Sequence, residues 1–181
     1  MPYFTTRDIT AIAMCAALWG VLSAYFAPAF WKATHLPFFC DMIGIILLIL
    51  VMWWVRKFGA ITTTAMIATI ITLMLNPDAT QFFGFAAASV VFDILTRPIG
   101  HQTSPEKSVL KLIGVFLASV ASTTVAGVII GYLFMSMNSL VTMYGGVAVF
   151  IILHAAGGAI GGIIGLVLIE ALSTRISLQK M

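Results

Sequence analysis

Residues 38 to 56 read FFCDMIGIILLILVMWWVR, an apolar run that Asp41 interrupts near its start. A helix of roughly 20 apolar residues crosses the hydrocarbon core of a bilayer, which is about 30 Å thick. This run therefore predicts a transmembrane helix, and the rest of the chain repeats the pattern. The expected spans are residues 8 to 27, 38 to 56, 58 to 75, 80 to 97, 109 to 135 and 143 to 173. We expect an all-α polytopic membrane protein, with six transmembrane helices in one domain over residues 1 to 181.

The composition and the placement of charge agree with this prediction. Hydrophobic residues make up 61% of the chain and charged residues 8%, which excludes an ordinary soluble domain. Lys and Arg lie on alternate breaks between the spans, with Lys32 as the one exception. The positive-inside rule then places both termini in the cytoplasm of a multi-pass plasma-membrane protein. Because this topology accounts for the net charge of +3, nucleic-acid binding is not indicated. The first span lacks the features of a cleaved signal peptide, so we expect a retained helix.

The cysteines and histidines do not form a metal-binding pattern. Cys15 lies in the middle of its span and Cys40 near the start of the next, depths too different for a disulfide, so two free thiols are expected. The three histidines fall in three different segments, and no Cys/His group has the spacing of a zinc site. We therefore expect no metal and no other cofactor.

Polar and aromatic residues gather on the predicted external half of the chain. Aromatic walls with a few polar anchors are typical of a cavity for a small planar ligand. The candidate ligand-binding residues are Trp31, His35, Asn76, Gln81, Asn138, Tyr144 and His154. For each aromatic residue, the alternative is a place in the aromatic belt at the bilayer interface. For His154, near mid-span, the alternatives are the floor of the cavity and a hydrogen bond to a backbone carbonyl of a neighbouring helix.

The first external loop, residues 27 to 37, is apolar, is bracketed by Pro28 and Pro37, and carries Lys32. We expect it to fold as a lid over the cavity. Near the cytoplasmic ends of two spans, Asp93 precedes Arg97 by one turn and Glu170 precedes Arg175. This placement predicts local charge pairing or snorkelling of the side chains to the membrane interface.

Small residues recur at helical spacing in three spans. Residues 154 to 165 read HAAGGAIGGIIG, and Gly127 and Gly131 repeat the spacing in the fifth span. Small residues at this spacing let another helix approach closely, either within the bundle or from a partner. Packing within the bundle is favoured for the glycines, whereas Ala13 and Ala17 in the first span fit an external partner equally well.

The whole chain resembles the substrate-binding S component of an energy-coupling factor (ECF) vitamin transporter. The resemblance lies in six spans with cytoplasmic termini, in the small-residue face Ala13-Met14-Cys15-Ala16-Ala17, and in the glycine-rich last helix followed by Ile169-Glu170-Ala171-Leu172. The nearest type is the YkoE-like hydroxymethylpyrimidine or thiamine type, which resembles this chain at Pro28 with Phe30-Trp31, at Trp54 to Ala60, and at Asn76-Pro77 through Gln81-Phe82-Phe83-Gly84.

This resemblance implies capture of a vitamin or vitamin precursor without enzymatic chemistry. A transmembrane coupling subunit and two cytoplasmic ATPases would drive uptake, and Ala13 and Ala17 would dock on the coupling subunit. The chain itself carries no Walker A motif.

Two other functions are open. An autonomous carrier or channel would need an intramembrane chain of ionisable groups or matched broken helices, and Asn76-Pro77 is the one obvious interruption. A rhomboid-like intramembrane serine protease shares a histidine and glycines on its last helix, but the Gly-x-Ser-Gly nucleophile motif is missing around Ser89.

Overall fold

The computed structural model describes residues 3–100 and 109–178, and within these ranges its regular structure is entirely helical. The helices are α1 (Thr6–Thr34), α2 (Phe38–Val55), α3 (Ala60–Leu75), α4 (Phe82–Gly100), α5 (Val109–Leu133), α6 (Met137–Tyr144) and α7 (Val147–Leu178). The all-α prediction is confirmed. Each predicted span corresponds to one long helix, and α6 is a short additional helix that the sequence analysis did not predict.

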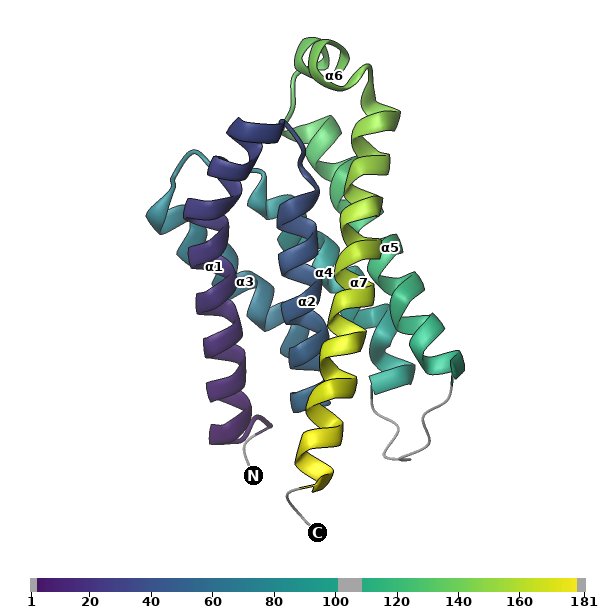
Figure 1. Cartoon of the computed structure of the whole chain (residues 1–181). Helices are drawn as coiled ribbons and strands as arrows, with labels where there is room; N and C mark the ends of the chain where they lie inside the picture. The colour runs from purple at the N-terminus through teal and green to yellow at the C-terminus, as the bar shows by residue number, and fades with distance from the viewer. Residues whose placement is uncertain (1–2, 101–108, 179–181) are drawn as a thin grey trace.

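The six long helices form one bundle (Figure 1). Their order around it is α1, α3, α4, α5, α7 and α2, which packs again on α1. α2 also contacts α3 and α4 across the middle of the bundle. The start of α1 and the end of α7 lie at one end of the bundle, which we call the terminal end, and α6 lies at the opposite end, which we call the α6 end.

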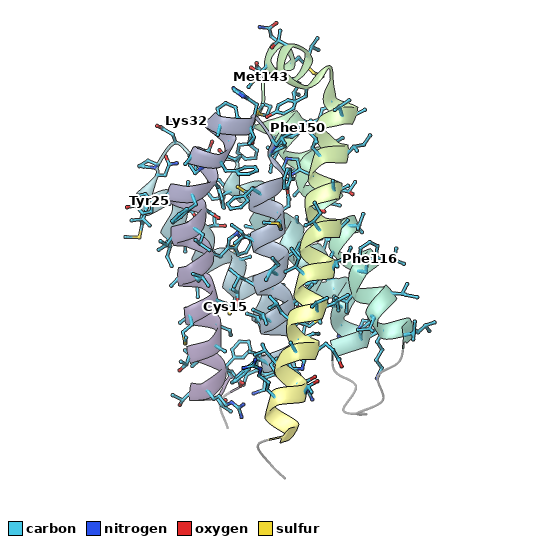
Figure 2. The ribbon with its side chains drawn as sticks, in the orientation of Figure 1. Cys15, Tyr25, Lys32, Phe116, Met143 and Phe150 are labelled. Atoms are coloured by element: carbon cyan, nitrogen blue, oxygen red, sulfur yellow. The ribbon has the colours of Figure 1, made fainter. Side chains whose placement is uncertain are left out.

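Five helices of the described residues are long and apolar enough to cross a membrane: α1, α2, α4, α5 and α7. α3 has 16 residues, or about 24 Å at 1.5 Å per residue, and is shorter than the hydrocarbon core. The outward surface of the bundle is also apolar, since large side chains such as Met14, Ile70, Leu117 and Ile152 are more than half exposed. Figure 2 shows such side chains along the length of the bundle. These are the properties of a multi-pass membrane protein.

At the terminal end, α1 begins with a capping box. The Thr5 hydroxyl accepts a hydrogen bond from the backbone N–H of Asp8, and the Asp8 carboxylate accepts one from the backbone N–H of Thr5. Lys57 lies 2.6 Å from the same carboxylate and so links the α2–α3 connection to the start of α1. These contacts satisfy backbone donors that a helix start leaves without intrahelical partners.

Asp93 has a role that the sequence analysis missed. Its Oδ2 atom accepts hydrogen bonds from the backbone N–H of Gly59, the backbone N–H of Thr62 and the Thr62 hydroxyl. A buried carboxylate on α4 thereby holds the first turn of α3, whose N-cap, Gly59, has no side chain to do so. The prediction for Asp93 considered only its own helix, and these partners lie on another one.

The prediction that residues 27 to 37 form a loop that folds as a lid is wrong. α1 continues through Pro28 to Thr34, and only residues 35 to 37 connect it to α2. Proline usually breaks a helix because it lacks the N–H donor and its ring crowds the preceding turn. Here the turn after Pro28 is held by tertiary contact, since Ala27 is buried and the Trp31 indole binds Tyr144. His35 caps the end of the helix: its backbone is left-handed (φ 57°), and its N–H donates a hydrogen bond to the Trp31 carbonyl.

The glycines of α7 pack within the bundle, as favoured from the sequence. α7 lies between α2 and α5. At Gly157, a Cβ atom would lie 2.5 Å from the Phe38 carbonyl oxygen of α2, and at Gly158 it would overlap the Thr123 hydroxyl of α5. Only glycine allows both neighbouring helices to approach this closely.

Candidate ligand-binding cavity

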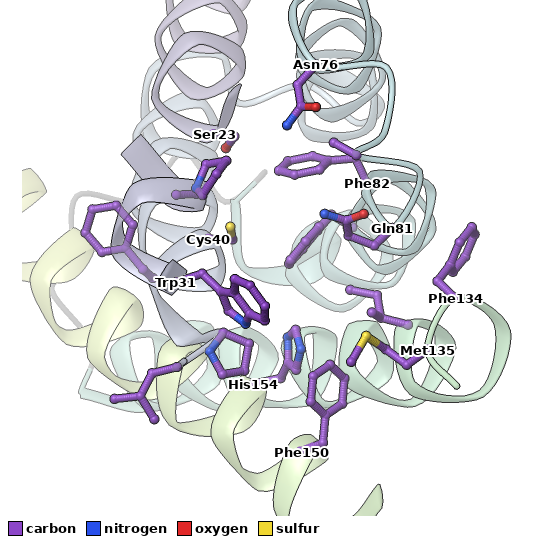
Figure 3. A pocket seen from close by; sticks show the side chains of 18 of the residues that line it. Ser23, Trp31, Cys40, Asn76, Gln81, Phe82, Phe134, Met135, Phe150 and His154 are labelled. Carbon is purple, nitrogen blue, oxygen red and sulfur yellow. The ribbon is translucent and has the colours of Figure 1, made fainter. Parts of the chain in front are cut away.

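A cavity of about 310 Å³ lies at the α6 end of the bundle (Figure 3). Its walls come from α1, the α1–α2 connection, α2, the α3–α4 connection, α4, α5, the α5–α6 connection, α6 and α7. The lining residues are Ser23, Ala27, Pro28, Trp31, Leu36, Pro37, Phe39, Cys40, Asn76, Asp78, Ala79, Gln81, Phe82, Phe85, Ile130, Phe134, Met135, Tyr144, Phe150 and His154. Its volume lies at the lower end of the range for small-molecule sites.

The last turns of α1 and the end of α6 close one side of the cavity. The indole N–H of Trp31 donates a hydrogen bond of 3.0 Å to the Tyr144 hydroxyl. Tyr144 is buried and packs edge-on against Phe150 of α7, with ring centroids 5.1 Å apart. His35 packs on the Trp31 ring, with centroids 5.3 Å apart. The continuous α1 helix therefore does the work that the sequence analysis assigned to a loop.

Aromatic rings make up much of the wall. Phe82 and Phe85 of α4 are buried and pack against each other, with centroids 5.0 Å apart. Phe39 of α2, which lines the cavity, stacks on Phe30 of α1, with ring centroids 4.6 Å apart. Rings in this arrangement present flat faces and edges to a planar guest, which suits offset-stacked or edge-to-face contacts.

The polar rim comes from the α3–α4 connection. Asn76 ends α3, and Asp78 and Gln81 follow before α4 begins. All three line the cavity, and Figure 3 shows the Asn76 and Gln81 side chains at its edge. The two amides supply both donors and acceptors to a ligand.

His154 forms the floor of the cavity together with Asp41 behind it. Nδ1 of His154 lies 2.7 Å from Oδ2 of Asp41, and the two side chains are 2% and 0% exposed. The two atoms lie at ion-pair distance, and the described residues provide no other hydrogen-bond partner for either group. The Phe150 ring meets the imidazole edge-on at 4.6 Å, and the Phe85 ring lies at 6.0 Å. Neither alternative from the sequence analysis included this carboxylate partner.

Asp41 also borders a second, much smaller chamber deeper in the bundle. This inner chamber has a volume of about 20 Å³ and is lined by residues of α1, α2, α4 and α5. Asp41, Trp19, Ser122 and Thr123 are among them. His154 thus borders the larger cavity, Asp41 borders the inner chamber, and Phe85 borders both.

The structure brings together five of the seven candidate ligand-binding residues. Trp31, Asn76, Gln81, Tyr144 and His154 line the cavity. The other two are exposed and do not line it, although His35 contacts it indirectly through Trp31. Asn138 lies on α6 and is not among the residues that line the cavity.

Two polar residues at the cavity were not predicted. Ser23 is buried, has no hydrogen-bond partner for its hydroxyl among the described residues, and lines the cavity. It precedes Ala27 and Trp31 by one and two helical turns, and that spacing is the signal that would have found it. Asp41 was noted only as an interruption near the start of the second apolar run, and it is fully buried beside His154.

The remaining residues singled out in the sequence are two cysteines and, in α1, two alanines. Cys15 and Cys40 are free cysteines, as predicted. Within residues 3–100 and 109–178, no group of three or more His, Cys, Asp or Glu side chains is arranged to hold a metal ion. Ala13 and Ala17 lie on the exposed face of α1, away from the cavity.

The fold and the cavity together define a helical membrane protein with an aromatic-walled cavity at one end of its bundle. Comparison with protein families and with curated proteins finds no match in sequence. Among solved structures, the chain is similar to one described as "Crystal structure of an S-component of ECF transporter". The similarity has a TM-score of 0.63 and covers 98% of this chain and 90% of that one, at 17% sequence identity. At this identity the comparison shows a shared fold.

Proposed function

We propose that this protein is the substrate-binding S component of an ECF-type transporter. In this role it captures a vitamin or vitamin precursor in an outward-facing cavity, and partner subunits drive uptake with ATP. The observation that carries the proposal is the cavity itself, which combines aromatic walls, a polar rim and a buried floor within a fold shared with an S component. The chain is assigned no enzymatic chemistry.

The proposed ligand is a planar nitrogen heterocycle of the thiamine or hydroxymethylpyrimidine type, as in YkoE-like S components. Trp31 and the phenylalanine rings stack on the ring, while Asn76 and Gln81 bind its polar edge. Tyr144 holds Trp31 in place, and His154 meets the ligand at the floor. His35 and Asn138 were also predicted to bind ligand, but neither lines the cavity.

The proposed topology has six spans, with α3 as the shortest and both termini in the cytoplasm. Arg7, Arg56 and Lys57 then lie at the cytoplasmic face, in agreement with the positive-inside rule. The α6 end, which holds the cavity, faces outward. The proposed partners are a transmembrane coupling subunit and two cytoplasmic ATPases.

We assign docking on the coupling subunit to the exposed face of α1. Ala13 and Ala17 lie one turn apart on this face, where small side chains allow another helix to approach closely. Neither residue lines the cavity, which α1 borders further along from Ser23 to Trp31, so docking and ligand binding use different stretches of α1.

The test is thermal unfolding of the purified protein in detergent, with a vitamin panel led by thiamine and hydroxymethylpyrimidine. A ligand at 100 times its dissociation constant stabilises the folded state by about 2.7 kcal/mol. A shift with one compound of the panel supports the proposal and identifies the ligand. Unchanged unfolding temperatures with every compound would refute it and favour a carrier or channel that binds its substrate weakly.

A further inference from the structure

The Asp41–His154 pair is isolated from other charges in the described residues. No Lys or Arg among them lines the cavity or the inner chamber. Besides the pair itself, the titratable groups at these two sites are Cys40 of α2, Asp78 of the α3–α4 connection and Tyr144 of α6. A net charge on the pair would therefore have no opposite charge beside it.

The neighbouring hydroxyls do not donate hydrogen bonds to the Asp41 carboxylate either. Ser122 donates its hydroxyl hydrogen to the Ser119 carbonyl, and Thr123 donates to the carbonyls of Ser119 and Val120. The described residues provide no hydrogen-bond partner for the carboxylate oxygens. Burying an uncompensated charge costs several kcal/mol, so the pair should be neutral as a whole.

Neutrality of the pair and the 2.7 Å contact at Nδ1 together place a hydrogen on Nε2 of His154. The pair is neutral as imidazolium with carboxylate or as imidazole with carboxylic acid. In the first form both ring nitrogens of His154 carry hydrogen. In the second, the Asp41 proton faces Nδ1, so the ring hydrogen is on Nε2. The other neutral state, with the ring hydrogen on Nδ1 and the Asp41 proton on Oδ1, is disfavoured because Oδ1 has no hydrogen-bond partner among the described residues to receive that proton. Nε2 would become an acceptor in that state, or if the pair lost a further proton and took a net charge of −1.

We propose that Asp41 is a positioning residue that keeps a hydrogen on Nε2 of His154, so that the cavity floor is a hydrogen-bond donor. The ligand then presents an uncharged acceptor at the floor, such as a ring nitrogen or a carbonyl oxygen. This specificity rests on the proposed function, because it concerns the ligand of the same cavity. The protonation of His154, by contrast, is measurable without any ligand.

The first experiment is ¹⁵N NMR of His154 in the full-length protein in detergent. The chain has three histidines, so the background variant His35→Gln/His101→Gln leaves a single histidine signal. Nε2 is expected to carry hydrogen in the folded protein at neutral pH. Asp41→Leu removes the partner of Nδ1, so the Nδ1 signal should shift to that of an imidazole nitrogen with neither hydrogen nor hydrogen bond. Asp78→Leu, the control on the cavity rim, should leave the signal unchanged. Two results would overturn the inference: an Nε2 signal without hydrogen in the protein that retains Asp41, or an Nδ1 signal that Asp41→Leu leaves unchanged.

The second experiment measures the direction of the hydrogen bond with hydroxymethylpyrimidine and its two analogues in which one ring nitrogen is replaced by C–H. One analogue should bind at least tenfold more weakly than the parent compound, and His154→Phe should abolish this difference. Equal binding of all three compounds would contradict a donor at the floor. If the parent compound does not bind at all, the proposed ligand type fails, and the NMR experiment still decides the protonation of His154.

Discussion

The substitution Gly157→Ala tests the packing on which the cavity floor depends. The added Cβ would lie 2.5 Å from the Phe38 carbonyl oxygen and 2.8 Å from the Cβ of Asp41. Overpacking of this kind costs about 1–3 kcal/mol, and the upper value applies here because a backbone carbonyl cannot rotate away. Alanine recovers about 1 kcal/mol through its higher helix propensity. The expected net loss is therefore about 2 kcal/mol.

Gly162→Ala is the matched control on the same helix. Its nearest contact would be the Cβ of Ser119 at 3.2 Å, so the propensity gain of about 1 kcal/mol should largely remain. The two variants should then differ by about 3 kcal/mol in the free energy of unfolding. For a chain of this length that corresponds to roughly 6–12 °C in unfolding temperature, measured in the same detergent. Equal unfolding temperatures would show that α2 and α7 are not packed as closely as described.

Three further substitutions test the cavity, the docking face and the start of α3. Trp31→Ala removes a wall of the cavity and the Tyr144 hydrogen bond, so it should weaken ligand binding more than tenfold in a titration; unchanged affinity would return Trp31 to the interfacial belt. Ala13→Trp or Ala17→Trp should abolish uptake in cells while leaving ligand binding by the purified protein intact, and uptake at the normal rate would contradict docking through this face. Asp93→Asn weakens the charge-assisted hydrogen bonds to the first turn of α3 and should destabilise the protein by about 1–3 kcal/mol in thermal unfolding; a variant as stable as the parent would show that this cap contributes nothing.

The helices were predictable from the sequence because the membrane requires long apolar segments, and α2 matches its prediction to within one residue. The C-terminal end of α1 was not predictable, because a proline such as Pro28 normally ends a helix. α6 was missed because its eight residues are too short and too mixed in polarity to stand out from a loop. In both places tertiary contact around Tyr144 decides the structure, and sequence periodicity does not report such contact.

The candidate site was partly predictable for a related reason. Polar side chains are costly in lipid, so Asn76, Gln81 and His154 stood out against an apolar background. Which of them meet depends on helix order, and α7 packs beside α2 although about a hundred residues separate them. The sequence therefore indicated His154 but not the carboxylate that it contacts.

The glycine pattern and the cavity floor are parts of one feature of the fold. Gly157 follows His154 by three residues, so both lie toward α2 on the same side of α7. Because Gly157 has no Cβ, α2 comes close enough for the Asp41 side chain to reach His154 at 2.7 Å. On the other side, a Cβ at Gly127 of α5 would lie 3.0 Å from the Cβ of His154, so a second glycine leaves room for the imidazole. The small residues that pack the bundle thus also position the one His–Asp pair that the described residues place at the cavity.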